Sequence, residues 1–236
     1  MKRILITVIA IFAINVAFSQ VKFGFKFGGN FASVSDVKAQ IDGVTVDIYD
    51  YDGVAFGFLF GAFTNISFLK FLAFQPELLF SMQGGKQRFG SGFEMEYSDR
   101  PKFSGGLDLE HLDNGTRYVF NYINLPLLLE IKVFNTGAGV LIGPQFGMNV
   151  YNSSTLRFKT QSGAEFDNSL KENFGGSPER FDMSLATGLQ YTEKHIIIGV
   201  RYNFGLTNHL NTIDDTGTEY KGWKNNVLQI SLSCFF

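Results

Sequence analysis

The sequence has few of the residues that stabilise a small disulfide-rich domain, and it has no long apolar run outside its first 19 residues. It contains one cysteine, Cys234, one tryptophan and five prolines. A single cysteine excludes an intramolecular disulfide framework. After residue 19 no segment approaches the roughly 18 continuous apolar residues of a membrane-spanning helix, so no such helix is predicted there.

The first 19 residues have the layout of a signal peptide. A basic start with Lys2 and Arg3 precedes a nearly continuous apolar stretch at residues 4–16, which is shorter than the roughly 20 residues of a spanning helix. Ala17 and Ser19 then supply the small residues of a cleavage site. The predicted organisation is a signal peptide at residues 1–19 and one mature domain at residues 20–236.

The charge balance gives no indication of nucleic-acid binding. Without Lys2 and Arg3 the chain keeps 18 basic and 22 acidic residues, a net charge of −4. Nucleic-acid-binding domains usually concentrate basic residues on one face. We therefore expect no nucleic-acid partner.

Phenylalanine and glycine are abundant, with 27 and 26 residues. The end of the chain shows how apolar residues are arranged, because polar and apolar residues alternate there in the order Leu228, Gln229, Ile230, Ser231, Leu232, Ser233, Cys234. Period-two alternation is typical of a strand with one polar and one apolar face. A last strand that ends on an aromatic residue, here Phe236, favours an outer-membrane β-barrel whose outer face contacts lipid.

Seven other segments show related alternation. The eight predicted strands are 21–33, 53–64, 71–84, 118–133, 138–151, 180–192, 195–206 and 227–236. Connections after the second, fourth and sixth strands are short, and those after the other strands are long and polar. A soluble β-sandwich also has alternating strands, but short periplasmic turns that alternate with long external loops are typical of outer-membrane barrels.

The predicted fold class is therefore all-β: an eight-stranded antiparallel up-and-down transmembrane β-barrel. The last strand is expected to pair with the first, and both termini are expected to be periplasmic. Pro76, Pro126 and Pro144 each remove a backbone donor, so we expect β-bulges at these positions. A count of ten strands stays open, because residues 85–117 are long enough to contain a hairpin.

Six charged residues fall on the inward face of the predicted strands. An eight-stranded barrel is narrow enough for side chains to fill its interior, and buried charges need partners or water. We expect a structural network there, with a narrow ion or solute path as the alternative. The predicted network consists of Lys22, Lys26, Glu77, Glu130, Asp182 and Arg201.

The long loops carry many acidic residues, including Asp42, Asp47, Asp50 and Asp52. Carboxylates of this kind can bridge to lipopolysaccharide through divalent cations, although no ordered cation-binding spacing is present. A solvated polar surface explains the same residues.

Catalytic chemistry finds little support. His209, with Asp214 and Asp215 nearby, is the best candidate for acid–base chemistry, and solvated loop residues explain the same pattern. We predict no catalytic, cofactor-binding or metal-binding residues and no enzymatic activity.

Three segments resemble the PorT-like outer-membrane β-barrel family of Bacteroidetes. They are VKFGFKFGGNF at residues 21–31, FQPELLFS at residues 74–81 and YINLPLLL at residues 122–129. The resemblance implies an eight-stranded barrel in a Gram-negative outer membrane, and the named member of the family is tied to type IX secretion and gliding. Glu130 stands where the family often has lysine, so a pairing with Lys22, Lys26 or Arg201 is expected.

These observations favour a non-catalytic outer-membrane barrel with a structural or interaction role, accessory to type IX-like secretion or to surface assembly. The expected contacts are membrane lipid, lipopolysaccharide, the barrel assembly machinery and envelope proteins that bind the external loops. Phe236 is predicted to be the end that the assembly machinery reads. A narrow channel is the alternative function, and a membrane-embedded enzyme is the third.

Overall fold

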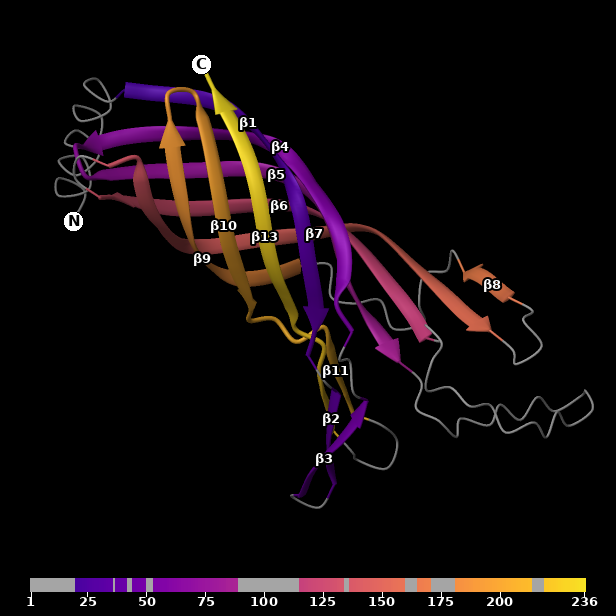
Figure 1. The fold of residues 1–236 in the computed structure, drawn as a ribbon. Coiled ribbons are helices and arrows are strands. Elements are labelled where there is room, and N and C mark those ends of the chain that lie inside the picture. The colour runs from indigo at the N-terminus through magenta and orange to yellow at the C-terminus, as the bar shows by residue number, and fades with distance from the viewer. Residues whose placement is uncertain are drawn as a thin grey trace, which may run out of the picture.

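A computed structural model describes residues 20–35, 37–41, 44–49, 53–88, 115–133, 136–159, 165–170, 181–213 and 219–236. The predicted signal peptide lies outside these residues. No helix among the described residues is long and apolar enough to cross a membrane. Eight strands form the barrel (Figure 1): β1 (Gln20–Val34), β4 (Ala55–Leu69), β5 (Leu72–Arg88), β6 (Gly115–Lys132), β7 (Ala138–Lys159), β9 (Phe181–Glu193), β10 (Ile196–Gly205) and β13 (Asn225–Phe235).

The barrel is closed, and all of its strand pairs are antiparallel. The strand order is β6-β5-β4-β1-β13-β10-β9-β7, and β6 also pairs with β7. The last strand pairs with the first, from Gly24 opposite Phe235 to Val34 opposite Asn225. This closure satisfies the backbone groups that a sheet edge would expose to lipid. The predicted eight-stranded barrel is confirmed, and β5 and β6 are direct neighbours in it.

The two faces of each strand differ as the alternation predicts. On β1, Phe23, Phe25 and Phe27 are 57%, 64% and 58% exposed, whereas Lys26 and Asn30 are 5% and 0% exposed. The apolar side chains therefore form the outer surface and the polar ones fill the lumen. This is the reverse of a soluble domain and suits a barrel surrounded by hydrocarbon.

Short connections gather at one end of the barrel, which we call the turn end. Residues 70–71, 133–137 and 194–195 connect neighbouring strands there. The start of β1 and the end of β13 lie at this same end, since Gln20 pairs with Ser67 and the Phe236 amide donates to the Phe23 carbonyl. The opposite end, which we call the loop end, carries the long connections (Figure 1).

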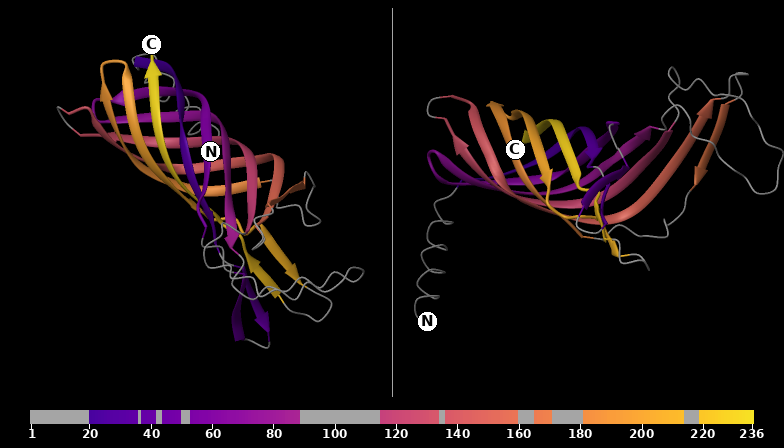
Figure 2. Two further views of the ribbon diagram at one scale, coloured as in Figure 1. Left: turned by 45° about the vertical axis from the view of Figure 1, so that its right-hand side comes forward. Right: turned by 90° about the horizontal axis from the view of Figure 1, so that it is seen from below.

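The loop end holds a second sheet that was not predicted from the sequence. Its strand order is β11-β12-β2-β3, with bounds Leu210–Ile213 for β11, Glu219–Gly222 for β12, Val37–Ile41 for β2 and Val44–Tyr49 for β3. The sheet joins the connection after β1 to the connection after β10 (Figure 2). The sequence Asp42–Gly43 between two alternating runs is a hairpin signal that could have revealed β2 and β3.

Three barrel strands continue past the loop end as one wall. The pairing of β5 with β6 extends to Arg88 opposite Gly115, and β6 pairs with β7 as far as Gly115 opposite Arg157. Strand β8 (Glu165–Leu170) adds to the outer part of β7 (Figure 1). The wall therefore projects on one side of the barrel only.

The prediction of β-bulges at the three prolines is wrong. Register is constant past Pro76, Pro126 and Pro144. A proline removes one donor but keeps its carbonyl, so the ladder loses one bond at that point without slipping. The register shift in this wall occurs instead between Asn121 and Tyr122.

Candidate functional site: the barrel lumen

The middle of the lumen is occupied by a charged triad, Lys26, Glu77 and Arg201. These side chains come from β1, β5 and β10 and meet because the closed barrel brings those strands around one axis. Arg201 Nη2 donates to Glu77 Oε1 at 2.9 Å and to Oε2 at 2.8 Å, and Lys26 Nζ donates to Oε1. All three side chains are buried, so they depend on one another for the solvation that water would provide.

Glu130 belongs to a layer closer to the turn end. Its carboxylate accepts from Asn65 Nδ2 at 2.7 Å and from Gln190 Nε2 at 2.7 Å. The nearest cation is Lys132, whose Nζ lies 3.8 Å from Glu130 Oε2. The expected pairing with Lys22, Lys26 or Arg201 is therefore wrong, because neutral amides and a lysine two residues along the same strand supply the partners.

Lys22 lies at the turn end, away from the triad. Its Nζ is 4.3 Å from the centre of the Phe235 ring, a cation–π contact. It borders a cavity of about 270 Å³ that Glu130, Lys132 and Gln190 also line. The lumen is thus hollow near the turn end.

Asp182 is near the loop end and contacts His209 rather than a cation of the triad. His209 Nε2 lies 3.2 Å from Asp182 Oδ1, and both side chains are buried. Asn225 Nδ2 lies 3.3 Å from the same histidine nitrogen and donates to Tyr122 Oη at 3.0 Å. His209 is therefore buried in the lumen, and the prediction of a solvated loop residue is wrong.

The proposed partners of His209 in sequence, Asp214 and Asp215, lie outside the described residues. Asn225 and Tyr122 were missed as contributors to the lumen, although both occupy inward positions of alternating strands. For Tyr122 the available signal was its alternation with the outward residues Ile123 and Leu125. Asn225 lies between Lys224 and Asn226, before the predicted strand 227–236, and gave no such signal.

A cluster of aromatic side chains lies in the lumen next to Asp182, His209 and Asn225, on the side of the loop end. The Trp223 ring packs nearly perpendicular to Tyr118 and Phe120, with ring centres 5.7 Å and 5.6 Å apart. Val34, Phe120 and Tyr122 form the buried apolar cluster against which Trp223 packs. Trp223 has a φ of 65°, a conformation that costs a non-glycine residue about 1–3 kcal/mol, so packing must hold it.

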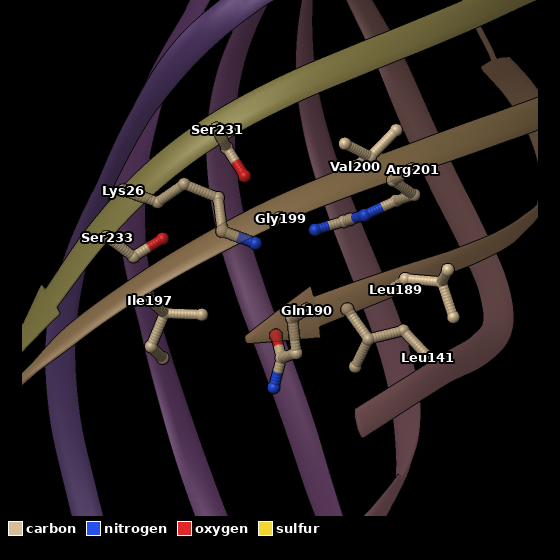
Figure 3. A pocket seen from close by; sticks show the side chains of 10 residues that line it. All are labelled: Lys26, Leu141, Leu189, Gln190, Ile197, Gly199, Val200, Arg201, Ser231 and Ser233. Atoms are coloured by element: carbon tan, nitrogen blue, oxygen red, sulfur yellow. The ribbon is translucent and has the colours of Figure 1, made fainter. Parts of the chain in front are cut away.

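A small cavity lies beside the triad and is lined by residues of β1, β7, β9, β10 and β13 (Figure 3). Its volume is about 10 Å³, which is room for one water-sized particle. Lys26, Arg201, Ser231 and Ser233 are among the residues that line it. The triad therefore crosses the middle of the lumen, and the aromatic cluster lies between the triad and the loop end.

The chain end lies outside the lumen. Phe236 is 74% exposed, and its ring centre is 5.9 Å from that of Phe25 on the outer surface. Cys234 is also exposed on this face, where it contributes to the apolar surface. The role of Phe236 in assembly stays a prediction.

The acidic residues of the first loop cannot be placed as a site. Asp47 belongs to β3, whose backbone is described, while Asp42, Asp50 and Asp52 lie outside the described residues. Among residues whose side chains are described, no group of three or more His, Cys, Asp or Glu is arranged to hold a metal ion. Bridging to lipopolysaccharide therefore stays a prediction.

Known proteins place this architecture in a family. No curated protein sequence matches the chain. Similar solved structures include Neisserial surface protein A, with 12% identity, a TM-score of 0.41 and coverage of 91% of this chain and 97% of that chain. Ail, the attachment invasion locus protein of Yersinia pestis, has 12% identity and a TM-score of 0.33, with coverage of 90% of this chain and 99% of that chain. The outer membrane protease OmpT from Escherichia coli has 11% identity and a TM-score of 0.40, with coverage of 91% of this chain and 97% of that chain.

These structural similarities are too low to indicate a role. The family model described as outer membrane protein beta-barrel domain matches residues 15–211, which is most of the chain. The apolar outer face and the closed sheet agree with that match. The chain therefore belongs to the outer membrane protein beta-barrel domain family and is an integral outer-membrane barrel.

Proposed function

We propose that this protein is a non-catalytic membrane anchor that holds the β11-β12-β2-β3 sheet outside the cell for binding to another envelope or secreted protein. The observation that carries this proposal is the pairing of β12 with β2, from Glu219 opposite Gln40 to Lys221 opposite Lys38. This pairing fastens two loops that are distant in sequence into one sheet. Such an arrangement suits recognition better than two separate loops, because less ordering entropy is lost on binding.

The sheet offers a specific way to bind. Within the described residues, β3 and β11 are the edge strands of the sheet, since each pairs with one neighbour only. An edge strand can accept an extended segment of another protein through backbone hydrogen bonds. The expected partner is therefore a polypeptide that adds a strand to β3 or β11.

The filled lumen argues against transport as the main role. A conducting path would have to pass the Arg201–Glu77 contact and the ring cluster of Trp223 with Phe120. Eight strands enclose an interior just wide enough for side chains. The narrow channel is therefore the weaker alternative.

Orientation and pathway complete the proposal. With the turn end in the periplasm, both chain ends are periplasmic and the second sheet faces outward, as the lengths of the connections favour. The resemblance to PorT-like barrels supports a link to type IX-like secretion or to surface assembly.

The proposal is tested by separating the sheet from the barrel. Proline at Ala39, the central residue of β2, removes a backbone donor in a strand that pairs on both sides, while Ala39→Thr is the matched control. In a strain that lacks the gene, Ala39→Thr should restore the profile of secreted and surface proteins, and Ala39→Pro should not. Both variants should reach the outer membrane as folded barrels.

Four results would contradict the proposal. The first is full restoration by Ala39→Pro, and the second is a profile that does not change when the gene is removed. The third is steady conductance of the purified, folded protein in planar bilayers, which would favour the channel. The fourth is modification of lipid or peptide that is lost in Asp182→Asn, which would favour the enzyme.

A further inference from the structure

The charges in the middle of the lumen do not balance. Lys26 and Arg201 share a single carboxylate, Glu77, and no other carboxylate of the described residues contacts either cation. The next carboxylate along the axis, Glu130, is engaged by Asn65, Gln190 and Lys132. Three buried groups thus carry a net charge of +1 when all are ionised.

The surplus charge faces unused hydrogen-bonding atoms. Arg201 engages Glu77 through Nη2 only, while its Nε and Nη1 are buried without a protein partner. The Ser233 hydroxyl is also buried without a partner. Buried donors are costly to leave unsatisfied, especially on a charged group.

These atoms border one small space. The charged and hydroxyl-bearing residues that line the cavity of about 10 Å³ are Lys26, Arg201, Ser231 and Ser233, and the rest of its lining is Gln190, Gly199 and the apolar residues Leu141, Leu189, Ile197 and Val200. Figure 3 shows the ends of Lys26 and Arg201 pointing toward one another beside Gly199. The space is of the size that holds one water molecule or one small ion, and it is too small for a large ligand.

We infer that this cavity binds a single monoatomic anion, a halide ion such as chloride. A halide would balance the positive charge of the triad and accept hydrogen bonds from Arg201 and Ser233. Water could fill the space, but it would leave the net charge uncompensated. The ion would bind the closed barrel and not the unfolded chain, so it would stabilise the folded state.

Halide substitution tests the site. The purified protein would be refolded into lipid vesicles in chloride, in bromide or in gluconate at one ionic strength, and unfolded by urea. At a halide concentration ten times the dissociation constant, the ratio of folded to unfolded protein should be about elevenfold higher than in gluconate. Crystals grown in bromide should show one anomalous scattering peak between Lys26 and Arg201.

Two variants and a control separate this effect from general salt effects. A Cβ at Gly199 would meet no atom closer than 3.2 Å, the Ser231 hydroxyl oxygen, so Gly199→Ala reduces the cavity without a severe clash. Lys26→Met removes the surplus charge and leaves Arg201 paired with Glu77. Both variants should unfold at the same urea concentration in halide and in gluconate. The control Lys22→Met, at the turn end, should keep the halide effect.

The inference is overturned if the wild-type protein unfolds identically in halide and gluconate and bromide gives no peak at the triad. It is also overturned if Gly199→Ala and Lys26→Met both fold and keep the full halide effect. The proposed function as a surface anchor stands in either case.

Discussion

Arg201 on β10 and Glu77 on β5 meet across the lumen, with Arg201 Nη2 2.9 Å from one carboxylate oxygen and 2.8 Å from the other. Lys26 adds a second cation to the same carboxylate. This contact joins opposite parts of the sheet that share no backbone hydrogen bond. It should therefore matter more for stability than an ion pair on the surface, because its partners are out of reach of water.

Removing the carboxylate should destabilise the barrel strongly. Glu77→Gln leaves two buried cations without a counter-charge, and we expect the free energy of unfolding to fall by about 3–5 kcal/mol. Urea unfolding in lipid vesicles measures this. Glu193→Gln, at an exposed position beside a turn, should change it by less than about 0.5 kcal/mol. Adding Lys26→Met to Glu77→Gln should recover part of the loss, and no recovery would contradict the charge argument.

The contact of His209 with Asp182 should hold the connection between β10 and β13, residues 206–224, onto the barrel. His209→Ala leaves the Asp182 carboxylate and Asn225 amide short of a partner, at a cost of about 1–3 kcal/mol. We expect protease to cut residues 206–224 faster in this variant while the barrel strands stay intact. His195→Gln, in the exposed turn before β10, is the control and should be cut like the wild-type protein. Equal cutting of all three proteins would show that the contact does not fasten this segment.

Removing the Trp223 ring should loosen the loop end without opening the barrel. Trp223→Ala deletes the ring that packs on Tyr118 and Phe120, with an expected cost of about 3–5 kcal/mol. Planar-bilayer recordings should show no conductance in the wild-type protein or in this variant, because the triad still fills the middle of the lumen. A current in Trp223→Ala alone would mean that the aromatic cluster, and not the triad, closes the path.

The cost of a charge on the outer face should depend on depth. Phe27 is near the middle of β1 and Val21 is near its start, and both side chains are exposed on the outer surface. Phe27→Arg should reduce the free energy of unfolding by about 2–4 kcal/mol, and Val21→Arg by about 0–1 kcal/mol, because the latter is near the interface. Urea titration in vesicles measures both. Equal costs would contradict a membrane centred on the barrel strands.

Phe236 should affect assembly more than stability. It forms one backbone hydrogen bond, to the Phe23 carbonyl, and its ring lies on the outer surface. Deletion of Phe236 should lower the amount of heat-modifiable barrel in the outer membrane, while Phe236→Tyr keeps an aromatic end and should assemble normally. Normal levels after deletion would refute the predicted signal.

The sequence determined the barrel because alternation is a local property. Each strand shows which residues face outward, and the parity of the loop lengths shows that neighbouring strands pair in turn. The eight strands follow from these two patterns, with ends displaced by a few residues, most at the loop end of β7. The second sheet was missed even though Asp42–Gly43 was visible, because a short hairpin in a polar loop gives a weak signal.

Only the tertiary structure decided which inward residues meet. Alternation places Lys26, Glu77 and Glu130 on the same face of their strands, but partner choice depends on strand tilt and on height along the axis. These quantities follow from closing the whole sheet and have no local signature in the chain. Lys26 therefore reaches Glu77, while Glu130 contacts Asn65 and Gln190. For the same reason His209, which follows the end of β10, lies against Asp182 inside the barrel.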